Sequence, residues 1–124
     1  MDERIKEKLI NRAKTNPVNF LGIDFTVIEE GRVEAHMPLH DEQRQYSGVT
    51  HGGVLAALAD TIAGFAAYTM TPLEKDVLTA ELKMSFLRAA WGNELIAKGE
   101  AALLTSPTVL VREYSGMMPE QAVQ

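Results

Sequence analysis

The chain has 124 residues, 46% of them hydrophobic, no cysteine and a formal net charge of −5. This length and composition predict a single domain, residues 1–124, with a packed core. The absence of cysteine excludes disulfides, thiolate nucleophiles and cysteine-ligated zinc, and it fits a cytoplasmic protein best. An acidic chain with no basic cluster argues against nucleic-acid binding, and no stretch predicts a membrane span, so neither partner is expected.

The first stretch of the chain predicts a short amphipathic helix over residues 2–14. The apolar positions on one face of this helix are Ile5, Leu9, Ile10 and Ala13. Asn16-Pro17 ends it, because the residue before a proline avoids the α region. We expect the helix to cover a sheet edge or a ligand tunnel; an ordinary surface helix is an equally good interpretation.

Two segments before residue 40 have the character of strands. Residues 25–29 predict one strand and Glu30-Gly31 a turn. Residues 32–37 then alternate between apolar and polar side chains, which is typical of a half-buried strand in a hairpin. Residues 41–50 predict a polar loop.

The chain is organised around the stretch from Ser47 to Met70, which predicts one long apolar helix over about 52–70. Its large side chains recur at helical spacing on one stripe, made of Leu55, Leu58, Ile62 and Phe65. A single carboxylate, Asp60, interrupts this helix. The positions three and four residues from Asp60 all hold small residues: Ala56, Ala57, Ala63 and Gly64. The carboxylate therefore has room beside it for a backbone or a ligand.

The start of this helix carries the sequence His51-Gly52-Gly53. Glycines let a ligand approach the backbone closely, and the first N–H groups of a helix have no internal partner. Such a helix start can hold a developing oxyanion, and Asp60 can supply a base or a nucleophile. The alternative is that Asp60 only pairs with a neighbouring segment or subunit, since an unpaired buried charge is costly.

The remainder of the chain predicts three further strands. Residues 77–88 alternate with period two, which predicts a long strand. Trp91-Gly92-Asn93 predicts a turn, and residues 94–104 and 108–114 predict the other two strands. No strand pattern follows residue 114.

The segment HGGVLAALADTIAGFAAY closely resembles the corresponding segment of hotdog-fold thioesterases, specifically the PaaI-type (phenylacetic acid degradation) family. The resemblance covers roughly residues 18–100 and includes FLGIDFTVIEEGRVEAHMPL before the segment and LTAELKMSFLRAAWGNELIAKGE after it. It implies an α+β hotdog fold, in which a curved antiparallel sheet wraps around one long central helix. It also implies a homodimer or homotetramer with active sites between subunits. Relatives continue through a final paired strand, and the pattern of this chain shows no counterpart of it. A divergent or shortened tail is therefore expected after about residue 101.

The resemblance implies hydrolysis of acyl-CoA thioesters. Asp60 from the facing subunit would act as nucleophile or general base, and the backbone N–H of Gly52 would hold the thioester oxygen. His51 would orient the loop or the water, or would simply hold the turn. Gln45 occupies the position where this family commonly has an asparagine, so it would orient the water or the thioester; an exposed loop amide is the alternative.

Four further residues are expected to bind substrate. Gly53 belongs to the oxyanion turn, and Thr61 and Thr79 would supply supporting hydroxyl groups near the active site. The resemblance implies that Arg88 lies where the family often has a positive residue near the phosphates of coenzyme A, and arginine suits phosphate recognition. The alternative is a solvated charge at the end of a strand. No metal or redox cofactor is expected, and coenzyme A enters only as part of the substrate.

Two other functions stay open at this point. One is a non-catalytic acyl-CoA-binding hotdog protein, for which the unusual tail is the best argument. The other is a hotdog dehydratase or hydratase, which pairs a histidine with an acidic residue in a different arrangement. Aryl-acetyl, hydroxyphenylacetyl and medium-chain acyl groups all remain candidates for the substrate.

Overall fold

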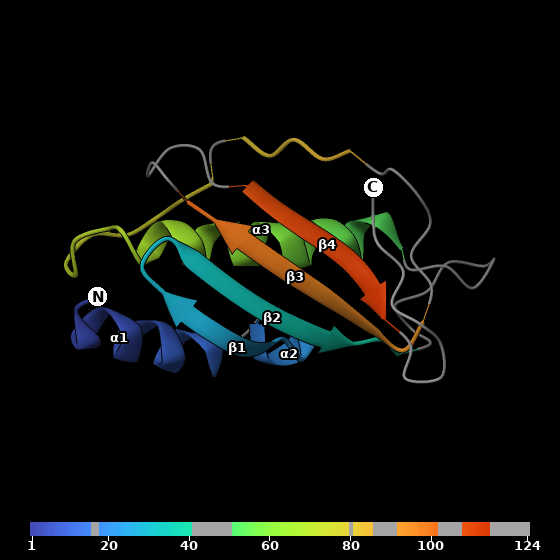
Figure 1. Ribbon diagram of the computed structural model, residues 1–124, viewed down its shortest axis with the longest axis horizontal. Helices are drawn as coiled ribbons and strands as arrows, with labels where there is room; N and C mark the ends of the chain where they lie inside the picture. Colours follow the sequence, from blue (N-terminus) through green and yellow to red (C-terminus); the bar gives the residue numbers. More distant parts are fainter. Residues whose placement is uncertain (16–17, 41–50, 80, 86–91, 102–107, 115–124) are drawn as a thin grey trace.

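In the computed structural model, one long helix lies across one face of an antiparallel sheet (Figure 1). The structure describes residues 1–15, 18–40, 51–79, 81–85, 92–101 and 108–114; in the last segment Val111 is the residue whose side chain is described. The elements in chain order are α1 (Glu3–Ala13), α2 (Val18–Leu21), β1 (Asp24–Glu29), β2 (Arg32–Pro38), α3 (Gly52–Tyr68), β3 (Glu94–Glu100) and β4 (Thr108–Tyr114).

The four strands lie in the order β1-β2-β3-β4, and every neighbouring pair is antiparallel. The expected hairpin of the first two strands forms, with Gly31 in its turn at a φ of 76°. The Gly31 N–H donates to Thr69 Oγ1 over 2.8 Å, and its carbonyl accepts from the Ala101 N–H over 2.9 Å. The hairpin turn is thereby fixed to the end of α3 and to the end of β3.

The core lies between the sheet and α3. Alternate side chains of β2 and β3 are fully or almost fully buried: Val33, Ala35, Met37, Leu95 and Ala97. From α3, Leu58, Ile62 and Phe65 of the predicted stripe are buried against them, and Leu55 is partly buried. The Phe25 ring stacks on the Phe65 ring with centroids 4.4 Å apart. Burial of each large side chain contributes roughly 1.5–3 kcal/mol, so this apolar layer fixes α3 on the sheet.

Helix α1 forms where its apolar spacing predicts it, and it is capped at its first turn. The Asp2 carboxylate accepts a hydrogen bond from the Arg4 backbone N–H over 2.9 Å. Hydrogen bonds from the Arg4 side chain and backbone lower the pKa of Asp2 from its usual value. Leu9 is completely buried and anchors the helix to the core.

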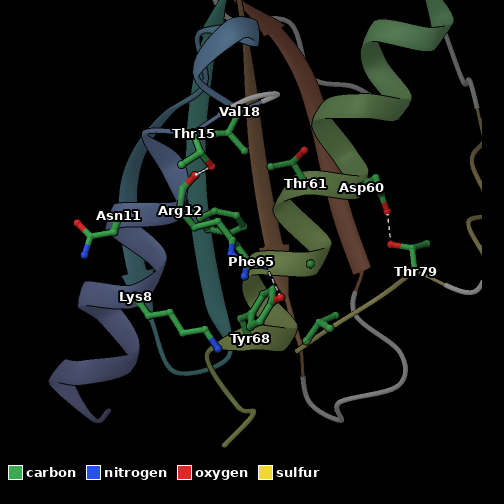
Figure 2. A pocket seen from close by; sticks show the side chains of 12 residues that line it. Lys8, Asn11, Arg12, Thr15, Val18, Asp60, Thr61, Phe65, Tyr68 and Thr79 are labelled. Atoms are coloured by element: carbon green, nitrogen blue, oxygen red, sulfur yellow. Dashed lines mark hydrogen bonds between the residues drawn. The ribbon is translucent and has the colours of Figure 1, made fainter. Parts of the chain in front are cut away.

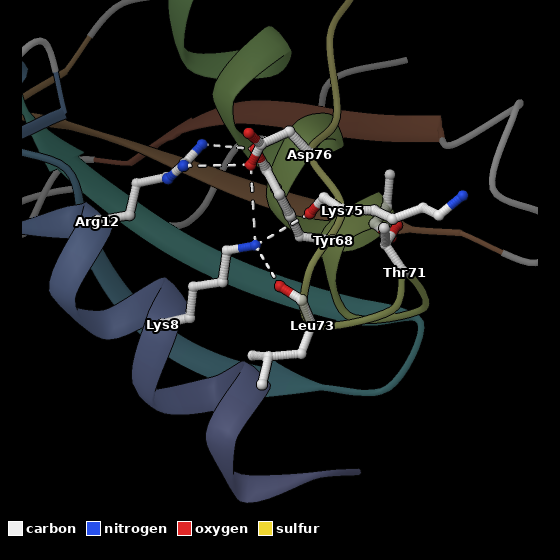
Figure 3. A network of polar contacts seen from close by, with 8 residues as sticks. Lys8, Arg12, Tyr68, Thr71, Leu73, Lys75 and Asp76 are labelled. Carbon is white, nitrogen blue, oxygen red and sulfur yellow. Dashed lines mark hydrogen bonds and ion pairs between the residues drawn. The ribbon is translucent and has the colours of Figure 1, made fainter.

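A polar contact network holds α1 beside the C-terminal end of α3 (Figure 3). The Lys8 ammonium donates to the carbonyl oxygens of Leu73 (2.8 Å) and Lys75 (3.0 Å). One turn later, the Arg12 guanidinium donates to the Tyr68 hydroxyl and to Asp76 Oδ1, the latter over 3.4 Å. These contacts fix the turn after α3 against α1.

One predicted strand is wrong in the part that the structure describes. Residues 77–79 and 81–85 form no strand, and Leu78 is 91% exposed. Alternation specifies which side chains share a face, but a strand also needs a neighbouring backbone for its N–H and C=O groups. The described residues of this segment have no such neighbour. The strand predicted over 94–104 ends at Glu100, and the short helix α2 was not predicted.

Among the described residues, no helix combines the length and the apolar character that crossing a bilayer requires. The polar loop predicted over 41–50 and the tail after residue 114 lie outside the described residues.

Candidate active site

The first turn of α3 is organised by the side chain of His51. His51 is the N-cap in extended conformation, and its Nδ1 atom accepts the Gly53 N–H over 2.9 Å. The His51 carbonyl accepts the N–H groups of Val54 (3.0 Å) and Leu55 (3.3 Å). Among the described residues, the Gly52 N–H has no hydrogen-bond partner. Within the described residues, the start of α3 therefore presents one donor without a partner at its positive end.

The carboxylate of Asp60 stands in the middle of α3 and is partly exposed. Its Oδ1 atom accepts a hydrogen bond from the Thr79 hydroxyl over 2.7 Å (Figure 2). Thr79 comes from the irregular segment after α3, so a residue far along the chain orients the carboxylate. Among the described residues, no hydrogen bond reaches the second oxygen of this carboxylate.

Gly52 and Asp60 lie about 12 Å apart along the axis of α3, since a helix rises about 1.5 Å per residue. An oxyanion donor and a nucleophile must both reach one carbonyl group, at about 3 Å each. The two groups of a single chain therefore cannot act on the same thioester.

Asp60 is one of the residues that line a groove of about 740 Å³, and its carboxylate points toward Thr79 (Figure 2). The α3 side of the groove consists of Asp60, Thr61, Gly64, Phe65 and Tyr68. An added Cβ at Gly64 would meet nothing within 4 Å, so this side of the helix is open. The α1 side consists of Lys8, Asn11, Arg12 and Thr15. The lining of the groove thus includes the carboxylate of Asp60 and the cationic side chains of Lys8 and Arg12.

The structure brings together only some of the predicted site residues. Thr79 contacts Asp60 directly. Thr61 lines the groove beside Asp60, but its hydroxyl donates to the Ala57 carbonyl of its own helix over 2.8 Å. His51 and Gly53 form the helix cap, apart from the groove. Gln45 and Arg88 lie outside the described residues, so their predicted roles stay predictions.

Sequence analysis missed the contribution of α1 to the groove. Lys8, Arg12 and Thr15 follow one another at intervals of four and three residues, the spacing of one helix face. This polar spacing is visible in the sequence, but the prediction of the helix rested on its apolar face alone. Tyr68 has a buried ring, and its hydroxyl accepts a hydrogen bond from the Arg12 guanidinium.

Known proteins resemble this chain over the segment that carries Asp60 and Thr79. The thioesterase superfamily matches residues 47–110, which include α3, the segment with Thr79, β3 and the first three residues of β4. The 1,4-dihydroxy-2-naphthoyl-CoA hydrolase of Escherichia coli is 34% identical over 84 residues, 68% of this chain and 62% of that protein. The proofreading thioesterase EntH of Klebsiella pneumoniae is 39% identical over 71 residues, 57% of this chain. The chain spans only 52% of that second relative.

A relative from Halobacterium salinarum, provisionally named an esterase, is 33% identical and is matched over 82% of this chain and 70% of its own length. Among solved structures, a thioesterase family protein from Silicibacter pomeroyi superposes with a TM-score of 0.84 at 25% identity, covering 98% of this chain and 89% of that chain. A thioesterase from Haemophilus influenzae gives a TM-score of 0.75 at 28% identity, covering 86% and 78%. These likenesses confirm the predicted α+β hotdog fold, and the chain belongs to the thioesterase superfamily.

Proposed function

We propose that the protein hydrolyses acyl-CoA thioesters to a free acid and coenzyme A. The observation that carries this proposal is Asp60 itself. Its carboxylate accepts a hydrogen bond from Thr79, and Asp60 lines a groove on a helix whose first N–H has no partner among the described residues. The naphthoyl-CoA hydrolase and the proofreading thioesterase among the relatives support the same reaction class.

The reaction breaks the C–S bond of the thioester and adds the elements of water. As general base, Asp60 takes a proton from water while the water oxygen attacks the carbonyl carbon. As nucleophile, it forms a mixed anhydride that water then cleaves. In both routes the sulfur leaves as the thiol of coenzyme A, and the carbonyl oxygen carries negative charge in the transition state. The Gly52 N–H is the proposed donor to that oxygen.

The active site is proposed to form between two copies of the chain. The distance of about 12 Å between Gly52 and Asp60 along α3 supports this arrangement, because one thioester cannot reach both in one chain. A facing subunit would supply Asp60 to the Gly52 of its partner. A dimer, or a tetramer made of two dimers, is therefore part of the proposal, as is a cytoplasmic location, which the lack of cysteine favours.

Within the superfamily we assign the chain to the PaaI-type branch, on the strength of the segment HGGVLAALADTIAGFAAY. The Escherichia coli PaaI protein superposes with a TM-score of 0.72 at 17% identity, a likeness of fold. The substrate panel that follows from this assignment contains phenylacetyl-CoA, hydroxyphenylacetyl-CoA and straight-chain acyl-CoAs.

The test is release of free thiol from that panel by the wild type and by Asp60→Asn. Asparagine keeps the size of the side chain and its hydrogen bond from Thr79, but it is neither a base nor a nucleophile. We expect hydrolysis of at least one ester by the wild type and a loss of 100-fold or more in kcat for the variant, the scale of general base catalysis. Circular dichroism and sedimentation show whether both proteins fold and assemble alike.

Two results would contradict the proposal. If the wild type binds the esters but hydrolyses none of them, the protein is an acyl-CoA-binding module. If Asp60→Asn retains most of the rate, the chemistry belongs to another group. Hydration of an unsaturated acyl-CoA without thiol release would instead identify a hydratase.

A further inference from the structure

The groove beside Asp60 continues along one face of α3 toward Tyr68. Thr61, Gly64 and Tyr68 follow each other at intervals of three and four residues, so they line one continuous strip. Asp60 and Tyr68 lie about 12 Å apart along the helix axis. The apolar side chains of Phe65, Val18 and Val77 also line the groove. Methylene groups of a ligand can pack against them, and the two ends of the strip differ in charge.

The end near Tyr68 carries more positive than negative charge. Lys8 and Arg12 extend from adjacent turns of α1, and both lie over the Tyr68 ring, at 5.2 Å and 4.9 Å from its centroid. Asp76 pairs with both cations, at 3.8 Å from Lys8 and 3.4 Å from Arg12. Two cations facing one carboxylate leave a net positive charge at this end of the groove (Figure 3). Asp60 lies at the opposite end.

Lys8 and Arg12 have different amounts of hydrogen-bonding capacity to spare. Lys8 donates hydrogen bonds to two carbonyl oxygens, of Leu73 and Lys75, and its ammonium lies 3.8 Å from Asp76 as an ion pair. Arg12 donates to Tyr68 and Asp76, which uses two of the five guanidinium N–H groups within the described residues. Its side chain is 42% exposed, against 25% for Lys8. Arg12 thus has N–H donors left to bind an anionic ligand. Lys8 instead holds α1 against the turn after α3.

We propose that this end of the groove is an anion subsite, in which Arg12 binds the terminal carboxylate of a dicarboxylic acyl group. The inference rests on the proposed thioester hydrolysis, with the thioester at Asp60 and the acyl chain lying over Phe65. A guanidinium binds a carboxylate through two parallel N–H donors, which gives direction as well as charge. Arg12 is therefore a specificity-determining residue for ω-carboxyacyl thioesters.

The phosphates of coenzyme A are the other source of an anion for this subsite. The apolar side chains that line the groove favour an acyl chain over the amide-containing arm of coenzyme A, because buried amides need partners. The two sources separate when two esters with the same coenzyme A are compared. Octanedioyl-CoA and octanoyl-CoA differ only in the terminal carboxylate, so any difference in their affinity belongs to the acyl tail.

The experiment measures the binding of both esters by calorimetry in the Asp60→Asn background, so no hydrolysis is needed. We expect octanedioyl-CoA to bind about tenfold more tightly than octanoyl-CoA, the scale of one hydrogen-bonded charge pair that is partly exposed. Arg12→Met should abolish this difference. The matched control is Lys14→Met, which removes one positive charge from an exposed residue at the end of α1 and outside the groove. The preference should survive in the control.

Asp76→Asn provides a test in the opposite direction. It removes the carboxylate that competes for Arg12 and keeps an oxygen for the Tyr68 hydroxyl, which donates to Asp76 over 3.1 Å. We expect the preference for octanedioyl-CoA to increase severalfold, whereas a purely structural Arg12–Asp76 pair would give no increase. This variant decides the matter even if Arg12→Met disturbs α1.

Equal affinity for the two esters, or a preference that Arg12→Met leaves intact, would overturn the inference. So would a failure to bind either ester. If Arg12→Met weakens free coenzyme A and both esters to the same extent, the subsite holds phosphates and the acyl assignment is wrong. Failure of the proposed function looks different: the wild type would bind octanedioyl-CoA preferentially and release no thiol.

Discussion

At the scale of single residues, the hydrogen bonds at the start of α3 determine which N–H group is free. The His51 ring accepts a hydrogen bond from the Gly53 N–H, and the His51 carbonyl accepts those of Val54 and Leu55. The cap thus leaves Gly52 as the donor without a partner among the described residues. A glycine here lets the sulfur and carbonyl of a ligand approach the backbone closely. The cap histidine has a structural role that its sequence motif alone did not distinguish from a catalytic one.

Replacing Gly52 by proline tests the free N–H directly. Proline is well accepted at the first position of a helix and lacks an N–H, and the extended His51 suits a residue before proline. We expect kcat to fall about 100- to 1,000-fold, the effect of losing one oxyanion donor. Gly52→Ala keeps the N–H and serves as the control for the added side chain. A Gly52→Pro enzyme as active as Gly52→Ala would exclude this N–H from the reaction.

The Thr79 hydroxyl is the described group that orients Asp60, through a hydrogen bond of 2.7 Å. We expect Thr79→Val to lower kcat/KM about tenfold, because a hydrogen bond to a charged group is lost at a partly exposed site. Thr79→Ser keeps the hydroxyl and should restore most of the rate, as steady-state thiol release would show. Equal activity of Val and Ser at this position would mean that the contact has no part in catalysis.

At the scale of elements, α3 holds the site in place because its opposite face is buried. Ile62 is completely buried, two residues beyond Asp60, so packing and chemistry occupy different faces of one helix. The period of α3 and the alternation of β2 were readable from the sequence, because each depends on residues close together in the chain. The alternation over 77–88 was equally clear, but the described residues 77–79 and 81–85 form no strand, since pairing depends on a distant backbone.

Ile62→Ala tests whether this packing holds the fold together. Ile62 is 0% exposed, so we expect a loss of about 2–5 kcal/mol in the free energy of unfolding, measured by urea denaturation. The matched control is Ile10→Ala on α1, where the side chain is 42% exposed. The same chemical change there should cost much less. Comparable losses at both positions would show that the contact with the sheet does not dominate stability.

At the scale of the whole molecule, the proposed reaction needs two chains. The helix that carries both Gly52 and Asp60 keeps them about 12 Å apart. Only a second copy can bring the donor of one α3 to the carboxylate of another. The dimer is thus a requirement of the proposed chemistry as well as an expectation from the resemblance to hotdog thioesterases.

Mixing two inactive variants tests this arrangement. A heterodimer of Asp60→Asn and Gly52→Pro contains one site with both native groups and one site with neither. We expect activity to return when the two proteins are mixed under conditions that exchange subunits, and thiol release reports it. Each variant alone, treated in the same way, is the control. No recovery despite demonstrated exchange would show that each site draws on one chain.

The sequence by itself determined the central helix, the hairpin and the strand over β3, and it made Asp60 a candidate site residue. These follow from local periodicity and from a motif within one stretch of chain. Tertiary structure alone decided that Thr79 reaches Asp60 across 19 positions and that Lys8 meets the Leu73 carbonyl across 65. It also decided that Arg12 shares a groove with the carboxylate. Such contacts depend on how the elements pack against one another. That packing depends on the burial of the whole core, and the residues of one short stretch do not specify it.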